Sequence, residues 1–247
     1  MTKLRVLDLF SGIGGFSLGL DRTGGFETVA FCEIAEFPRQ VLSHHWPEVP
    51  CHADITALSK SDINGSVDVI CGGFPCQDIS ASGRGEGLYG KRSGLWSEMC
   101  RLIGEIRPRF VIVENSPNLL SGADGRWMGT VLGDLAAFGY DAEWHVIPLA
   151  ATGAPHLRER VVIIAYAAGV RQPGSGQLLK SIHPAPDAYR EADWLVDAVR
   201  KGSVPFMCWR HDGVPARLAK PQLHAFGNAI GPELAALIGN AILASLH

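Results

Sequence analysis

The chain of 247 residues is long enough for one large domain that buries roughly 70–75% of its unfolded surface. Hydrophobic residues make up 47% of the chain and charged residues 19%, which excludes a disordered or collagen-like protein. The formal net charge is only −3, and the longest apolar run, 161–170, is shorter than the ~18 residues that a membrane-spanning helix needs.

The apolar pattern predicts short buried strands that alternate with helices. Runs such as VDVIC and FVIV are rich in β-branched residues and are followed at once by glycine or polar residues. The predicted strands are 4–10, 28–32, a short one just before Asp54, 67–71, 110–113, 143–148 and 161–166. The predicted helices run from the glycines to about Arg22 and over 35–44, 95–106, 127–138 and 232–246. This alternation indicates an α/β fold with a mostly parallel sheet covered on both faces, in which only the last two strands form an antiparallel pair.

The alternation stops after Tyr166, which predicts three parts in the chain. Residues 168–220 contain many Gly, Pro and Ser residues with little periodicity, so they form either a small second lobe or an elaborate loop. We expect a main domain over 1–167, a short lobe over 168–220, and a C-terminal helix within 221–247 that returns to the main domain.

A glycine-rich turn, SGIGG at 11–15, follows the first strand and opens a helix. Such a turn lets a ligand approach the backbone, although a tight strand-to-helix connection also explains it. Glu33 and Asp54 each follow a strand, and an acidic residue about 20 residues beyond such a turn can bind the hydroxyls of a ribose. Each alone is more simply a surface acid. Together with the turn they suggest an adenosyl ligand at the carboxyl edge of the sheet, and no P-loop demands that it carry phosphate.

The six cysteines include no C-x-x-C pair, so they indicate neither a disulfide framework nor a structural zinc site. Most are expected to be small buried hydrophobic residues. Cys76 differs because it lies in the loop GGFPCQ directly after strand 67–71, where a thiol is placed to react. The following serines and glycines, with Arg84, Lys91 and Arg92, predict either a basic lid over a phosphate backbone or a plain surface loop.

Two polar pairs reach the same edge of the predicted sheet. Glu114 and Asn115 directly follow strand 110–113, which brings a possible general acid close to the cysteine. Arg158 and Arg160 alternate before strand 161–166, so they share a face on which a carbonyl or a phosphate can be bound. A surface ion pair is the simpler alternative for the arginines. The turn GNAI at 227–230 opens the last helix and can close a ligand pocket.

In this order, these blocks resemble those of the cytosine carbon-5 DNA methyltransferases. The resemblance covers about 1–166 and 210–247 and rests on DLFSGIGGF, Glu33, Asp54, GGFPCQDIS, Glu114-Asn115, the R-x-R of Arg158 and Arg160, and GNAI. It implies the S-adenosylmethionine-dependent methyltransferase fold, a Rossmann-like sheet with one antiparallel strand. The domain 1–167 would then be catalytic and cofactor-binding, and 168–220 would be a short target-recognition lobe.

The resemblance also implies the chemistry. The methyl group of S-adenosylmethionine would pass to carbon 5 of a cytosine flipped out of duplex DNA. Cys76 would attack carbon 6 as a thiolate, and Glu114 would protonate ring nitrogen 3. Asn115 would brace the loop that carries the cysteine. Arg158 and Arg160 would bind the cytosine carbonyl and a neighbouring phosphate.

Further residues are assigned by the same resemblance. Glu33 would hold the ribose, Asp54 the adenine amino group, and Ile34 with Ile55 the two faces of adenine. The full set of cofactor residues would be Phe10, Gly12, Gly14, Glu33, Ile34, Asp54, Ile55, Pro75, Leu95, Asn228 and Ala229. The residues implied to bind DNA are Gln77, Ser80, Arg84, Lys91 and Arg92. No metal is expected.

The sequence also departs from the family pattern. Ser116 and His156 stand where Val and Gln are frequent in the family, and the lobe is short, which predicts a short or relaxed recognition sequence. Two alternatives stay open, an RNA cytosine methyltransferase and a regulatory protein that keeps the fold without turnover. The DNA enzyme is favoured over the RNA enzyme by the motif form Pro75-Cys76-Gln77. It is favoured over the regulatory protein by the presence of both Cys76 and Glu114.

The setting of the protein follows from the same features. The first residues, MTKLRVLDLF, lack the apolar core and the cleavage site of a signal peptide, so we expect a cytoplasmic protein without a membrane segment. One subunit carries every block, which favours a monomer acting on double-stranded DNA. A restriction endonuclease would be a functional rather than a physical partner, as in a restriction-modification system.

Overall fold

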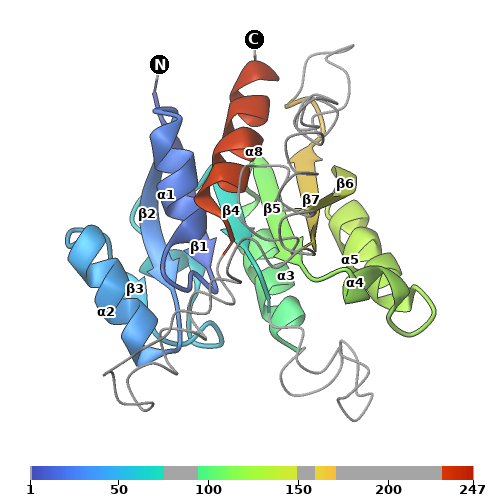
Figure 1. Cartoon of the computed structure of the whole chain (residues 1–247), viewed down its shortest axis with the longest axis horizontal. Coiled ribbons are helices and arrows are strands. Elements are labelled where there is room, and N and C mark those ends of the chain that lie inside the picture. Colours follow the sequence, from blue (N-terminus) through green and yellow to red (C-terminus); the bar gives the residue numbers. More distant parts are fainter. Residues whose placement is uncertain (1, 75–93, 149–158, 171–229, 247) are drawn as a thin grey trace, which may run out of the picture.

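A computed structural model describes residues 2–74, 94–148, 159–170 and 230–246. Its strands form one seven-stranded sheet in the order β3-β2-β1-β4-β5-β7-β6 (Figure 1). The strands are β1 (Leu4–Leu9), β2 (Phe26–Cys32), β3 (Cys51–His52), β4 (Val69–Gly72), β5 (Phe110–Asn115), β6 (Tyr140–Pro148) and β7 (Glu159–Ala167). The helices are α1 (Gly15–Arg22), α2 (Glu36–His45), the 3-10 helix η1 (Lys60–Asp62), α3 (Leu95–Ile106), α4 (Asn118–Ser121), α5 (Arg126–Ala137) and α8 (Pro232–Ala244).

The directions of the strands confirm the predicted α/β class. The pairs β1–β2, β1–β4, β2–β3 and β4–β5 are parallel. Strand β7 is antiparallel to β6, as the pattern of the last two strands predicted, and also to β5, so the expected sheet with one antiparallel strand is confirmed. It is therefore one reversed strand with two antiparallel neighbours, because β6 returns to the direction of the others.

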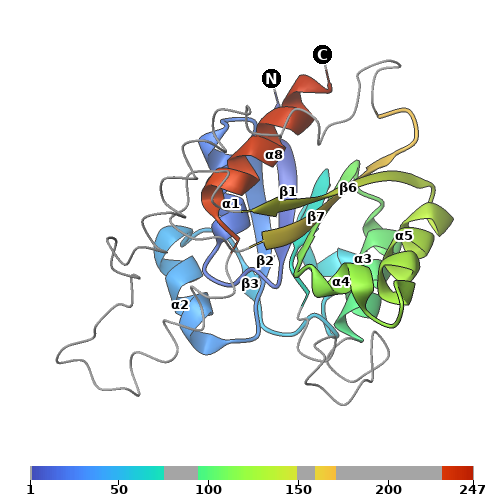
Figure 2. The same cartoon turned by 45° about the vertical axis from the view of Figure 1, so that its right-hand side comes forward.

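Helices cover both faces of the sheet (Figure 2). On one face, α1 and α8 pack through Phe16, Leu20, Leu234 and Ile238 against strand residues such as Val6. On the other face, the described part of the chain packs α3 and α5 against alternate strand residues, through Met99, Leu102, Ile103, Val131 and Leu135. Strands β4 and β5 and most of β7 are buried on both sides, as a sheet covered on both faces requires. Polar side chains are thereby left to the strand ends, where the site lies.

Several boundaries differ from the predicted ones. Strand β6 begins at Tyr140 rather than Glu143, because its first three residues pair with the end of β7, from Ala165 to Ala167, a contact that the local sequence does not show. The short elements η1 and α4 were not predicted. Most of the predicted lobe at 168–220 lies outside the described residues. No helix in the described ranges is long and apolar enough to cross a membrane.

Candidate active site

Glu114 lies at the carboxyl end of β5, next to the centre of the sheet. The alternation of β5 puts its side chain on the face of Phe110 and Ile112, and the residue is 7% exposed. Strand β7 pairs Glu114 with Val162, so Arg160, two residues earlier, shares that face. The Arg160 guanidinium forms an ion pair with the Glu114 carboxylate. The register of the sheet thus brings Glu114 and Arg160 into contact, whereas the sequence alone did not show that the two residues meet.

Burial controls the protonation of Glu114. Removal from water raises the pKa of its carboxyl group from 4.5 to about 7, while the neighbouring Arg160 charge opposes this rise. A carboxyl group with a pKa near neutrality can hold and deliver a proton at physiological pH. The pair therefore has the properties of a general acid with a cation beside it.

The loop that leads to Cys76 passes directly over Glu114. A Cβ placed on Gly73 would lie 2.6 Å from Glu114 Oε2, so only glycine allows this close approach. The Asn115 side-chain amide donates to the Phe74 carbonyl oxygen over 3.3 Å, while its own oxygen accepts from the Ser116 amide. Phe74 is the last described residue before Pro75. The contact is of the kind expected of a residue that braces the cysteine loop.

The described cysteines are poor candidates for a nucleophile. Burial raises the pKa of Cys32 to about 12 and that of Cys100 to about 11, and it also raises the pKa values of Cys51 and Cys71. A thiol is reactive as its thiolate, so these four groups are inert at neutral pH. Cys76 itself lies outside the described residues.

The predicted glycine-rich turn forms with the strain expected of a ligand loop. Gly12 and Gly14 have positive φ angles of 54° and 85°, and Phe10, a non-glycine residue, has a φ of 53°. Such a conformation at a non-glycine residue is uncommon and often marks a functional loop. A Cβ on Gly12 would meet no atom of the described residues within 4 Å, so these residues leave the space above the turn open.

Glu33 is anchored beside this turn. Its Oε2 accepts from the Gly12 amide and its Oε1 from the Ala35 amide, both over 2.8 Å. These bonds fix the carboxylate at the edge of the sheet and leave further acceptor positions for hydroxyl groups. The turn and the acidic residue therefore meet, as the adenosyl hypothesis requires.

Asp54 and Ile55 follow β3 in a second turn. Asp54 Oδ1 accepts from the amide and the hydroxyl of Thr56, and these bonds lower the pKa of the carboxyl group. Ile55 is only 5% exposed and packs in the core, whereas Ile34 is 79% exposed. The two isoleucines predicted to sandwich adenine are thus in different environments, and Ile34 has the free surface for a ligand.

A buried polar group beneath the glycine-rich turn was missed from the sequence. Asp8 is fully buried in β1 and accepts from the Ser17 hydroxyl of α1 over 2.7 Å. Burial raises the pKa of its carboxyl group from 3.8 to about 7. The available signal in the sequence was a single acidic residue, Asp8 of the segment DLF, within a mostly apolar predicted strand. Within the described ranges, no cluster of three or more His, Cys, Asp or Glu residues could hold a metal ion.

Part of the predicted site cannot be placed. Leu95, at the start of α3, is half-buried against the core. The remaining predicted site residues lie outside the described residues: Pro75, Cys76, Gln77, Ser80, Arg84, Lys91, Arg92, Arg158, Asn228 and Ala229.

Comparison with known proteins matches the chain to one family. The family model of C-5 cytosine-specific DNA methylases matches residues 4–196. The chain is 36% identical over 166 residues to the Type II methyltransferase M2.BsuMI of Bacillus subtilis, a match that covers 66% of this chain and 42% of that protein. It is 32% identical to the Type II methyltransferase M.HhaI of Haemophilus parahaemolyticus, over 67% of this chain and 50% of that one. The chain thus spans about half the length of these curated relatives.

Solved structures share the fold. The Entamoeba histolytica methyltransferase EhMeth superposes with a TM-score of 0.70 over the full length of both chains at 14% sequence identity. A mutant of Spodoptera frugiperda DNMT2 superposes with a TM-score of 0.57 at 20% identity, over 69% of this chain and 52% of that one. At these identities the likeness concerns the fold alone.

Proposed function

Because the chain belongs to the C-5 cytosine-specific DNA methylase family, we propose that it methylates carbon 5 of cytosine in double-stranded DNA with S-adenosylmethionine as methyl donor. The observation that carries this proposal is the buried Glu114, paired with Arg160 and overlain by Gly73. It puts a proton donor with a pKa of about 7 within reach of the loop that continues to Cys76.

The proposed chemistry divides between Cys76 and Glu114. Carbon 5 of cytosine is a poor nucleophile, and attack by the Cys76 thiolate on carbon 6 moves electron density toward carbon 5 and ring nitrogen 3. Glu114 donates its proton to nitrogen 3, which stabilises the charge that develops there. After methylation, a base removes the carbon-5 proton and the thiolate leaves, so the cysteine is regenerated.

The surrounding residues hold the base and the DNA in this proposal. Arg160, with Arg158, binds the cytosine carbonyl and a phosphate, and Asn115 keeps the cysteine loop in position. The cytosine has to leave the base stack to reach Glu114, at a cost of a few kcal/mol. We assign contacts with the DNA backbone to Gln77, Ser80, Arg84, Lys91 and Arg92. We assign target recognition by a single subunit to the lobe 168–220.

The described residues fit an adenosyl cofactor. The Glu33 carboxylate is fixed beside Gly12, above which the described residues leave space, and this arrangement is suited to a ribose. The exposed Ile34 offers an apolar surface for adenine. S-adenosylmethionine supplies an electrophilic methyl group when bound. The residues that would hold it are Phe10, Gly12, Gly14, Glu33, Ile34, Asp54, Ile55, Pro75, Leu95, Asn228 and Ala229.

The first test is transfer of tritiated methyl groups from S-adenosylmethionine to unmethylated genomic DNA. We expect the wild type to produce 5-methylcytosine and Cys76→Ser to produce none, while both bind S-adenosylhomocysteine equally well. Transfer RNA serves as the parallel substrate. Methylation of the RNA and not of the DNA would overturn the proposed substrate, and equal transfer by Cys76→Ser would overturn the proposed nucleophile.

A further inference from the structure

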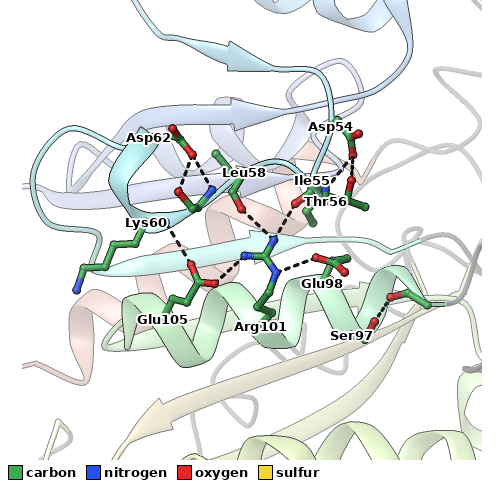
Figure 3. Close-up of polar contacts among 12 residues, drawn as sticks. Asp54, Ile55, Thr56, Leu58, Lys60, Asp62, Ser97, Glu98, Arg101 and Glu105 are labelled. Carbon is green, nitrogen blue, oxygen red and sulfur yellow. Dashed lines mark hydrogen bonds and ion pairs between the residues drawn. The ribbon is translucent and has the colours of Figure 1, made fainter.

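Arg101, in the middle of α3, joins this helix to the turn that follows β3 (Figure 3). Its Nη2 donates to two backbone carbonyl oxygens, those of Ile55 and Leu58, each over 2.9 Å. Its Nε and Nη1 pair with Glu98 and Glu105 of the same helix at 2.8 and 2.7 Å. All three nitrogens of one guanidinium group are therefore engaged, and two of the bonds cross to another segment.

The segment that receives these bonds carries the proposed adenine contacts. Ile55 directly follows Asp54, whose carboxylate closes a turn by accepting from Thr56. The side chains of Ile55 and Leu58 are 5% and 2% exposed and lie in the core beneath the turn. Core packing thus holds the turn from below, and Arg101 holds its backbone from the side of α3.

A second link connects the same helix to the same segment. Glu105, which pairs with Arg101 through Oε1, accepts through Oε2 from the Lys60 amide over 3.3 Å. A reciprocal pair of bonds between Ser59 and Asp62 then caps η1. Arg101 and Glu105 together attach the whole stretch from residue 55 to residue 60 to α3.

Ion pairing within the helix does not account for this arrangement. The side chains of Arg101, Glu98 and Glu105 are 33%, 27% and 35% exposed, and partly exposed pairs at helical spacing stabilise a helix only weakly. The two carbonyl oxygens, in contrast, need a donor that reaches both at once. The planar fork of arginine does this while it pairs with carboxylates, which a lysine ammonium cannot match.

We propose that Arg101 is a positioning residue for the adenine end of the cofactor site, which acts by fixing the backbone of residues 54–58 on α3. This role rests on the proposed function, since Asp54 and Ile55 are assigned to the cofactor there. Arg101 is not among the residues assigned to contact the cofactor. Its loss loosens the turn, so the Asp54 carboxylate and the backbone around Ile55 are no longer preorganised for binding.

The test compares Arg101→Met with Arg107→Met. Arg107 follows α3 and also donates to two carbonyl oxygens, those of Gly104 and Phe138. Neither of these bonds reaches the Asp54 turn. Arg101→Met is expected to raise the Kd for S-adenosylhomocysteine about tenfold, which corresponds to about 1.4 kcal/mol. The Kd of Arg107→Met is expected to stay at the wild-type value. Arg101→Lys, which keeps the charge and the aliphatic stem but not the planar fork, is expected to fold like the wild type and to show the same raised Kd as Arg101→Met.

Kinetics separate positioning from general damage to the fold. Arg101→Met is expected to raise the KM for S-adenosylmethionine about tenfold while kcat at saturating cofactor stays within about twofold, the pattern of lost ground-state binding. A loss of kcat with unchanged KM would overturn the role, because it would report a smaller active fraction.

Amide hydrogen exchange without any ligand gives a readout that is independent of function. Exchange in a peptide covering residues 53–59 is expected to accelerate in Arg101→Met and not in Arg107→Met. If Arg101→Met shows unchanged exchange and normal cofactor binding, the role of Arg101 is overturned while the proposed function stands. If the wild type binds no cofactor, the proposed function fails and this role fails with it, whatever the exchange rates show.

Discussion

The carboxyl group of Glu114 holds its proton up to near-neutral pH because burial outweighs the attraction of Arg160. A group with a pKa of about 7 is protonated below that pH and ionised above it. The rate of the step that needs its proton is therefore expected to fall as pH rises through about 7. Glu114→Gln should lower kcat by about 10²–10⁴-fold, the usual contribution of a general acid.

The measurement is single-turnover methyl transfer between pH 6 and 8.5 with saturating cofactor. Glu114→Gln should also lose the falling limb of the pH profile, whereas Glu48→Gln, an exposed carboxylate, should keep it. An unchanged limb in Glu114→Gln would assign that titration to another group.

Asp8 is expected to make the stability of the protein depend on pH. Its pKa rises from 3.8 in a solvated chain to about 7 in the folded protein, because the carboxyl group is fully buried. The folded state therefore binds more protons between these values, and the free energy of unfolding falls as pH rises from about 4 to about 7. Three pKa units correspond to about 4 kcal/mol, which is an upper limit for the change.

Urea unfolding at pH 5 and pH 8 tests this expectation. Asp8→Asn should reduce the difference in unfolding free energy between the two pH values. Ser17→Ala removes the hydroxyl that stabilises the ionised carboxylate, so it should move the midpoint of the pH dependence upward. If Asp8→Asn has the same pH dependence as the wild type, Asp8 is not the group responsible.

At the scale of elements, the end of β4 is shaped to pass close to its neighbours. A Cβ on Gly72 would lie 2.5 Å from the Leu9 carbonyl oxygen, and one on Gly73 would lie 2.6 Å from Glu114 Oε2. A side chain at Gly72 would therefore collide with the backbone of β1, whereas one at Gly73 would have to displace the Glu114 carboxylate. The sequence predicted that both glycines lie in a loop, but it gave no reason why residue 73 has to be glycine.

Gly73→Ala is expected to displace the Glu114 carboxylate. We expect a loss of activity of at least tenfold, since a shift of about 1 Å in a catalytic group can cost about 10²-fold. Stability should change little, because the side chain that moves is a flexible one. The matched control is Gly133→Ala in α5, where a Cβ would meet no atom of the described chain within 4 Å and activity should be unchanged. Full activity of Gly73→Ala would show that the carboxylate can shift without consequence.

At the scale of the whole molecule, the two ends of the described chain are packed together. Helix α8 lies against α1, with Gly15 and Gly19 facing the backbone of Ile230 and Pro232 (Figure 2). A Cβ on Gly19 would overlap the Pro232 carbonyl oxygen and crowd Ala235. The close contact lets α8 cover the sheet beside the glycine-rich turn, so distant parts of the sequence complete one core.

Gly19→Val is expected to force these helices apart. Overpacking of this kind costs about 1–3 kcal/mol, and the lowered free energy of unfolding should appear in urea denaturation. Gly129→Ala lies at an exposed helical position where a Cβ would meet none of the residues that the structure describes within 4 Å, and it should instead stabilise the protein by about 0.5–1 kcal/mol. A Gly19→Val variant as stable as the wild type would mean that the helices separate without loss of core packing.

The predicted and observed elements differ most where burial is partial. The strands around Val6, Ile70 and Ile112 were predicted because both faces are buried and the sequence is continuously apolar. The start of β6 was missed because it depends on pairing with the end of β7, which is distant in the sequence. Arg101 resembled an ordinary surface arginine between Glu98 and Glu105. Nothing in the local sequence indicates that its side chain donates hydrogen bonds to two backbone carbonyl groups more than forty positions away.

The sequence alone determined which residues are candidates for the proposed chemistry and that most of them adjoin predicted strands, because chemically suited side chains and apolar runs are both local features. Only the tertiary structure decided how these residues meet. The antiparallel placement of β7 beside β5 brings Arg160 to Glu114, and the parallel placement of β4 brings Gly73 over the same carboxylate. Strand order and register arise from packing between segments far apart in the chain, and burial, which sets the pKa of Glu114, exists only once those segments have assembled.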